Sequence, residues 1–246
     1  MPSSKALVWF RRDLRNYDHA ALFQALKTSN QVYCVFVFDT NILQHLPKKD
    51  RRVEFIWHSV IELKHALQAQ GGDLMICHGD AIETITSLAI KLNIDTIFSN
   101  RDYEPTAIAR DAAVAKSVLA HKIAFEQYKD QVIFEKGEVT KDDGKPYTVF
   151  TPFSKKWKAT LTQTPFSFYE TEKHFSQFYK SMPKAVPSLA QIGFQPSSLT
   201  LPSKEIPLAI IEKYDETRDI PSIAGTTRLS VHLRFGTISI RKLVSI

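Results

Sequence analysis

Cysteine is scarce in this chain: 246 residues contain only Cys34 and Cys77. Both lie inside apolar runs typical of buried strands, where cysteine behaves as a small hydrophobic residue. The sequence therefore excludes the disulfide framework of small secreted domains, and we expect a reducing, cytoplasmic setting.

Long apolar runs and blocks of like charge are also missing. Only five apolar residues precede Arg11 after the opening Met-Pro-Ser-Ser-Lys, so the sequence predicts no signal peptide. No run approaches the roughly 20 residues of a membrane span, and we expect no membrane partner. The net charge of +6 permits a nucleic-acid partner without requiring one.

A glycine-rich turn is absent after the first predicted strand, residues 6–10. The residues that follow are Arg11-Arg12-Asp13-Leu14-Arg15. A dinucleotide could not approach this backbone as it approaches a G-x-G-x-x-G loop, so an ordinary NAD-dependent enzyme is disfavoured. The cluster can bind an anionic ligand or form an internal salt-bridge network, and we favour the network.

The first half of the chain has the pattern of an α/β domain. Apolar strand-like runs alternate with helical patterns, which predicts a doubly wound, five-stranded parallel sheet. Ligands of such sheets bind at the carboxyl ends of the strands, where Asp39 and the segment 100–105 are candidates. Turn formation and helix capping would explain the same residues. The predicted strands are 6–10, 32–38, 74–78, 96–99 and 123–127, and the predicted helices are 18–26, 53–67, 81–92 and 105–119.

The alternation of strands and helices stops near Asp130. A turn at 141–146 is predicted to join two short extended pieces, 132–134 and 147–150, and a helix is predicted from Thr151. Aromatic and basic residues then alternate from Phe166 to Lys184. Such a pattern can stack on single-stranded nucleic acid. We favour the alternative that the aromatic rings anchor a long linker.

Two short helices are predicted near the end of the chain. Thr226 or Thr227 can cap a helix that runs through Leu233 to Gly236, and Ser239 can cap residues 240–244. Hydroxyls, free N–H groups and Arg228 would suit a pyrophosphate. The hydroxyls can equally serve only as caps, with Arg228 paired to Asp219 or Glu216.

Three separated motifs, in this order, resemble the DNA photolyase/cryptochrome family. They are Leu7 to Arg15 followed by Asp18, Gly144 to Phe153, and Gly225 to Arg241. The resemblance covers the chain end to end. It implies an antenna-type α/β domain at 1–130, an interdomain linker at 131–204, and the truncated start of a helical FAD-binding domain at 205–246.

The resemblance also implies a function. The whole protein would be a deoxyribodipyrimidine photo-lyase, a monomer that repairs cyclobutane pyrimidine dimers in damaged DNA with FAD and blue light. Arg218 would contact DNA, and this chain would hold no catalytic residue, no metal and little or no FAD by itself. A cryptochrome-type photoreceptor without repair activity is one alternative, and a free-standing nucleotide-binding α/β module is another. The implied flavin-binding residues are Tyr214, Thr226, Thr227, Arg228, Leu229 and Ser230.

One departure from the family pattern concerns the antenna chromophore. Folate-binding relatives carry an Asn-Glu pair where this chain has Thr106 and Ala107, after Tyr103-Glu104-Pro105. Alanine cannot supply the carboxylate that would hold the amino groups of a pterin. The resemblance therefore disfavours methenyltetrahydrofolate and leaves a deazaflavin, another chromophore or no antenna as alternatives.

Overall fold

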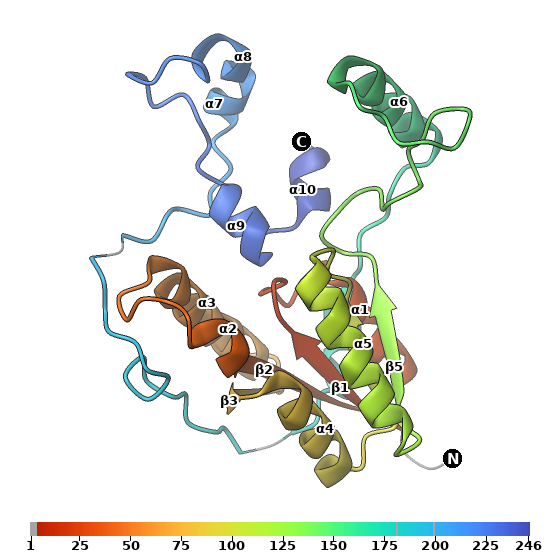
Figure 1. The fold of residues 1–246 in the computed structure, drawn as a ribbon, viewed down its shortest axis with the longest axis vertical. Coiled ribbons are helices and arrows are strands. Elements are labelled where there is room, and N and C mark those ends of the chain that lie inside the picture. The colour runs from red at the N-terminus through yellow and green to blue at the C-terminus, as the bar shows by residue number, and fades with distance from the viewer. Residues whose placement is uncertain (1–3, 181, 199) are drawn as a thin grey trace.

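A five-stranded parallel sheet forms the centre of the molecule (Figure 1), as the sequence predicts. The computed structural model describes residues 4–180, 182–198 and 200–246. The strand order is β3-β2-β1-β4-β5, so the chain moves from β1 to one edge and then crosses to the other. The strands are β1 (Lys5–Phe10), β2 (Gln31–Asp39), β3 (Leu74–Gly79), β4 (Thr96–Asn100) and β5 (Ala124–Tyr128).

Helices cover both faces of this sheet. Because strand side chains alternate between faces, Val8 and Phe10 of β1 enter one core while Leu7 and Trp9 enter the other. All four are buried, which explains why the strand is apolar throughout. The first core is covered by α1 (Ala20–Thr28) and α3 (Arg51–Gln68), and the second by α4 (Ala81–Leu92) and α5 (Pro105–Leu119).

Helix α1 begins two residues later than the sequence predicts. Asp18 has a φ of +42°, a left-handed conformation that cannot continue a right-handed helix. His19 caps α1 instead, because its Nδ1 accepts a hydrogen bond from the Leu22 N–H at 3.0 Å. Asp39 likewise caps the short helix α2 (Thr40–Leu43) by accepting from the Asn41 N–H at 3.1 Å, in agreement with the turn-and-cap interpretation.

The predicted pair of extended pieces after β5 is wrong. The turn itself forms, since the Gly144 N–H donates to the Lys141 carbonyl at 2.9 Å. Residues 132–134 and 147–149 are irregular, however, and Phe150 already begins α6 (Phe150–Gln163). A two-stranded ribbon needs an apolar surface to pack on, and here the Phe134 ring packs on Trp157 of α6 instead.

The second part of the linker returns to the sheet and is anchored by its aromatic residues. A 3₁₀ helix, η1 (Thr171–Gln177), leads into a segment that we call the strap, residues 178–180 and 182–197. Phe178 is buried in the first core, and the Tyr179 N–H donates to the Val32 carbonyl at 3.0 Å. The Tyr179 ring stacks on Tyr33, with 4.3 Å between centroids. The anchor interpretation is confirmed for this segment.

Four short helices end the chain: α7 (Leu208–Glu212), α8 (Tyr214–Thr217), α9 (Ser230–Phe235) and α10 (Ile240–Val244). The prediction that Thr226 or Thr227 caps α9 is wrong, because Arg228 has a φ of +53° and the helix begins only at Ser230. Gly236 ends α9 with a φ of +63°, as predicted. Ser239 caps α10, also as predicted, by accepting from the Lys242 N–H at 3.2 Å.

Figure 1 shows α9 and α10 above the sheet, with α7 and α8 projecting on one side and α6 on the other. Among the described residues, no helix combines the length and the apolar character needed to cross a bilayer.

Candidate functional site

The turn between α9 and α10 docks on the loop that follows β1, at the carboxyl end of the sheet. The Leu14 N–H donates to the Phe235 carbonyl at 3.0 Å, and Arg15 Nη1 donates to the Gly236 carbonyl at 3.1 Å. A Cβ atom at Gly236 would overlap the Arg12 carbonyl oxygen and lie 2.5 Å from Asp13 Cα. Glycine is required there for both the close approach and the positive φ.

Asp18 joins three segments of the chain at this interface. Its carboxylate accepts from the Ser239 hydroxyl and, at 2.9 Å, from Arg241 Nε, so it contacts the first turn of α10. It also accepts from the Tyr169 N–H of the linker at 2.9 Å. Asp18 therefore ties the β1 loop, the linker and α10 together at one buried carboxylate.

Asp130 is a second buried carboxylate in the same network. It accepts from Arg15 Nη2 and Arg241 Nη2, each at 2.8 Å, and from the Ala20 N–H at 3.1 Å. Burial acts to raise the pKa of Asp130, but the charges of Arg15, His19 and Arg241 outweigh it and hold the pKa well below its usual range. Two carboxylates thus face two guanidinium groups in this network.

The Arg/Asp cluster after β1 forms the internal network that we favoured from the sequence. Arg11 pairs with Asp111 at 2.5 Å, and Arg12 pairs with Asp102 at 3.2 Å. Asp13 accepts from the Asn100 side chain at 2.7 Å. Asn100 and Asp102 belong to the segment 100–105, and both side chains are buried in this network. Their polar groups hold the loop in place and are not free to bind an anion.

No role was predicted from the sequence for Asp130 or Arg241, although both are central to this network. A weak signal was present for each. Arg241 follows Ile240 in the apolar pattern of α10, and a charge at such a position needs a buried partner. Asp130 lies just beyond the carboxyl end of β5, the edge of the sheet where polar groups gather.

Three of the residues predicted to bind flavin line one cavity of about 310 Å³. Its walls come from α7, α8, α10 and the approach to α9. Pockets that bury small molecules span about 300–1,000 Å³, so this one lies at the lower end of that range. The predicted residues in its lining are Tyr214, Thr227 and Leu229, and the others are Ile211 and Leu243.

The other three predicted flavin residues, Thr226, Arg228 and Ser230, are exposed and lie outside that lining. Within the described chain, Arg228 forms no ion pair with Asp219 or Glu216. Asp219 pairs with Arg218 instead, at 3.6 Å. The Arg228 guanidinium and the two hydroxyls are therefore available to an added anionic group. Their chemistry fits a pyrophosphate, and in the sequence they alternate with the lining residues Thr227 and Leu229.

Arg218, the predicted DNA contact, lies beside this cavity. Its guanidinium is 5.7 Å from the centroid of the Tyr214 ring, and about half of its side chain is exposed.

The antenna positions lie elsewhere, in the first turn of α5, where Thr106 is exposed and Ala107 is buried. Over the described ranges, no three His, Cys, Asp or Glu side chains are grouped as metal ligands would be.

Comparison with known proteins identifies relatives along almost the whole chain. The sequence profile of the family described as DNA photolyase matches residues 6–171. The chain is 30% identical to a deoxyribodipyrimidine photo-lyase of Halobacterium salinarum, over 96% of this chain and 53% of that protein. It spans about half the length of the curated photo-lyases it matches.

Solved structures share its fold. An archaeal photolyase from Sulfolobus tokodaii with two FAD molecules is 26% identical and gives a TM-score of 0.73, over 98% of this chain and 54% of that one. A cryptochrome from Synechocystis gives a TM-score of 0.76 at 21% identity, over 100% of this chain and 56% of that one, and shows similarity of fold alone.

Proposed function

This chain belongs to the DNA photolyase family, and from that premise we propose that the whole protein repairs cyclobutane pyrimidine dimers in DNA with FAD and blue light. Within it, this chain supplies the α/β domain, the linker and one wall of the flavin site. The observation that supports the proposal is that Tyr214, Thr227 and Leu229 line one cavity.

The residues of this chain would bind and orient the flavin. Thr226, Thr227 and Ser230 offer hydroxyl groups to a pyrophosphate, and Arg228 offers a guanidinium, which binds phosphate in a bidentate manner. Tyr214 and Leu229 offer apolar contact. When bound, reduced FAD excited by light would supply the electron that splits the dimer. Arg218 would hold a DNA phosphate near this wall, which positions DNA without reading its sequence.

An antenna chromophore in the α/β domain is part of the proposal. Ala107 provides no carboxylate for a pterin, so methenyltetrahydrofolate is disfavoured and a deazaflavin or another flavin-like chromophore is a better candidate. The Sulfolobus tokodaii photolyase, described with two FAD molecules and the implication of a novel light-harvesting cofactor, gives a precedent within the family. Absorption spectra of the whole protein after removal of FAD would reveal any antenna chromophore.

The test is a light-dependent repair assay. The whole protein is mixed with an oligonucleotide that carries one thymine dimer, and the ultraviolet absorbance of the restored thymines is followed in blue light and in the dark. We expect recovery only in the light. Flavin photoreduction without loss of dimer would contradict repair and favour a cryptochrome-type photoreceptor.

A second measurement concerns this chain alone. With one wall of the pocket, we expect it to bind FAD weakly or not at all. Purification of the 246-residue chain with one tightly held FAD per molecule would contradict this assignment of a single wall.

A further inference from the structure

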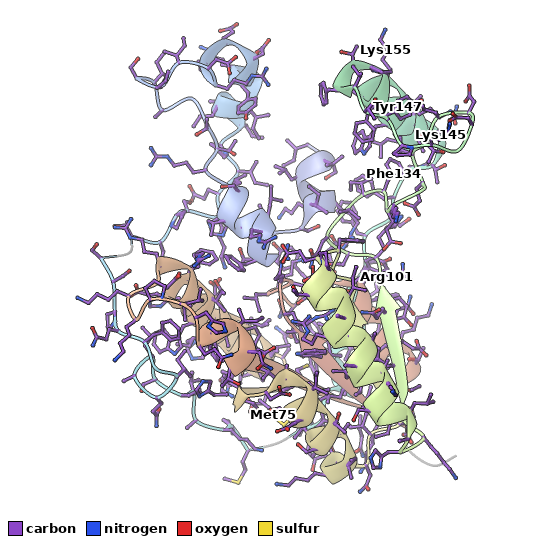
Figure 2. All side chains as sticks on the ribbon, viewed as in Figure 1. Met75, Arg101, Phe134, Lys145, Tyr147 and Lys155 are labelled. Atoms are coloured by element: carbon purple, nitrogen blue, oxygen red, sulfur yellow. The ribbon has the colours of Figure 1, made fainter. Side chains whose placement is uncertain are left out.

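A buried histidine joins helix α9 to the α/β body, in addition to the contacts of the β1 loop. His232 is 1% exposed, and its ring lies 5.4 Å from that of Phe55 on α3, edge to face. The Phe235 ring lies 5.5 Å from the same phenylalanine. Figure 1 shows α9 between the α7–α8 pair and the body, and the side chains drawn in Figure 2 occupy the space between α9 and the body. His232 and Phe235 therefore dock α9 on α3 through Phe55.

Both ring nitrogens of His232 have hydrogen-bond partners. Nε2 lies 3.2 Å from the Pro202 carbonyl oxygen, and Nδ1 lies 2.7 Å from the Thr237 hydroxyl. A carbonyl can only accept, so Nε2 must carry a proton and donate it. In the neutral ring Nδ1 is then the acceptor, and the Thr237 hydroxyl donates to it. One tautomer of the neutral imidazole thus satisfies both partners.

A charged imidazolium is less stable at this place. Burial is the largest cause, and it lowers the pKa of His232 below its ordinary value. Lys204, in the segment before α7, acts in the same direction, whereas the Pro202 carbonyl and Glu62 of α3 oppose the shift without reversing it. Lys204 and Glu62 also pair with each other. A second ring proton would in addition face the Thr237 hydroxyl, which would have to stop donating.

The position of His232 affects two walls of the candidate flavin cavity. Leu229 lines that cavity and lies three residues before His232, and both side chains are buried on the same side of α9. The Pro202 carbonyl belongs to the segment that leads into α7, and Ile211 of α7 lines the cavity as well. One imidazole ring therefore connects the chain segments that form two of the walls.

We propose that neutral His232 is a positioning residue that keeps α9 docked on α3 and on the segment before α7, and that protonation of its ring in mild acid releases this contact. The consequence for flavin binding rests on the proposed function, whereas the docking itself does not. The undocked ring has the ordinary pKa of about 6.5, and the docked ring has a lower pKa. Docking is therefore strongest above pH 7 and weakens as the pH falls below 6.5.

Hydrogen exchange of the 246-residue chain without flavin tests the docking. The amides of Leu233 and Thr237 report on it, because they donate to the carbonyls of Leu229 and His232 at 2.9 and 3.0 Å. Their protection factors, which compare observed and intrinsic rates at the same pH, are measured at pH 7.5 and pH 5. Amides of β3 around Met75, labelled in Figure 2 well away from α9, serve as the internal reference.

We expect the protection of the α9 amides to fall by up to about 30-fold between pH 7.5 and pH 5, relative to β3. This is the increase in the undocked population if its ring titrates with a pKa of about 6.5 while the docked ring stays neutral. An equal loss of protection in β3 would show general unfolding in acid and would overturn the proposal.

The matched variant is His232→Gln. Its side-chain amide can still donate to the Pro202 carbonyl but cannot take up a proton, so the fall in protection should nearly disappear. His121→Gln is the control, because that histidine is exposed in the turn after α5, and it should show the same fall as wild type. Carboxylates titrate in all three proteins, so the difference between them isolates His232. An equal fall in wild type and His232→Gln would overturn the proposal.

Lys204→Gln gives an independent test that keeps the histidine. Removing this charge should raise the pKa of the docked ring, so the α9 amides should lose less protection in acid than they do in wild type. This variant decides the question if His232→Gln leaves α9 unprotected at both pH values. A fall equal to that of wild type would then overturn the proposal.

Release of FAD from the whole protein, followed by flavin fluorescence, tests the consequence for the cavity. We expect wild type to release FAD several-fold faster at pH 5 than at pH 7.5, and His232→Gln to show a smaller difference. Exchange that depends on His232, together with FAD release that does not, would uphold the docking and contradict the assignment of α9 to the flavin wall.

Discussion

Asp18 shows how one residue can determine the position of a distant segment. Its left-handed backbone turns the chain out of the β1 loop, and Asp is among the few residues that tolerate this conformation. Its carboxylate then accepts from Tyr169, Ser239 and Arg241, which lie far along the chain. The conformation before α1 and the docking of α10 therefore depend on the same side chain.

Replacing Asp18 by Asn tests its charge, since Asn keeps the shape and tolerates the same backbone conformation. We expect the free energy of unfolding to fall by about 1.5–3 kcal/mol, the range for hydrogen bonds to a charged group. Urea unfolding measures the change. Asp219→Asn is the control, because that side chain is 83% exposed and should contribute almost nothing. Equal effects would contradict the role of the Asp18 network.

Gly236 allows a second test at this interface. Gly236→Ala introduces a Cβ that overlaps the backbone of Arg12, and φ is positive as well. Gly144→Ala is a matched control: its φ is +77°, but nothing lies within 4 Å of the added Cβ. The control should lose only about 1 kcal/mol of conformational energy.

We expect Gly236→Ala to destabilise the protein more than this control and to release α9 and α10 from the sheet. Hydrogen exchange of the backbone amides in residues 230–244 should then speed up, whereas amides of β1 stay protected. Equal exchange in the two variants would show that the docking of α9 and α10 does not depend on close approach at Gly236.

The lowered pKa of Asp130 predicts that the free energy of unfolding falls in acid. Its folded pKa lies below its unfolded value of about 4, so its contribution to stability is complete above pH 4 and is lost as the pH falls below it. Asp130→Asn should lose about 3–5 kcal/mol at pH 7, because two guanidinium groups lose a buried partner. The variant should also lose less of its remaining stability than wild type between pH 5 and 3. If the stabilities of wild type and Asp130→Asn fell in parallel over this pH range, the assigned role of the Asp130 carboxylate would be contradicted.

At the scale of elements, the hydrophobic pattern predicts most of the α/β half correctly. Helix α4 occupies 81–92, as its apolar spacing indicates, and all five predicted strands form. The misplaced start of α9 has a local cause. The left-handed conformation of Arg228 depends on how its neighbours pack, and an arginine at that position gives no indication of it in the sequence.

The contribution of the strap to the first core could not be predicted from the sequence. Its prolines and aromatic residues indicate an irregular linker, and they do not show that Phe178 completes the first core. The fit is close, since a Cβ on Gly72 would lie 2.9 Å from the Phe178 ring. Phe178→Ala should cost about 3–5 kcal/mol, measured by urea unfolding. Phe168→Ala, where the ring is about half exposed, should cost far less; a similar cost would contradict anchoring by the strap.

At the scale of the whole molecule, the predicted boundary at residue 130 can be tested by truncation. Residues 1–130 lack Phe178, Leu189, Ile192 and Phe194, all buried in the first core. At about 1.5–3 kcal/mol each, their burial is comparable with the total stability of a typical domain, about 5–15 kcal/mol. We expect residues 1–197 to melt cooperatively and residues 1–130 to bind a hydrophobic dye and melt broadly. If residues 1–130 melted as cooperatively as residues 1–197, the domain boundary would lie at residue 130, as predicted from the sequence.

The candidate site was predictable only in part. Some of its residues lie close together in the sequence, whereas others meet only because the chain folds. Tyr214, Thr227 and Leu229 lie within 16 residues of one another in the sequence, and in the structure they line one cavity. The pairing of Asp18 and Asp130 with Arg241 joins positions more than 100 residues apart. Each of these residues is ordinary in its local sequence, and only the fold determines which charges meet.

The place of the strap in the chain also determines the order in which the protein can fold during synthesis. The apolar surface of α1 and α3 stays uncovered until Phe194 has left the ribosome, although the last strand of the sheet, β5, ends at Tyr128. At ribosomal rates of about 5–20 residues per second, that interval is on the order of 3–13 s. During that interval the nascent domain would expose this apolar surface, the kind of surface that chaperones bind and that leads to aggregation.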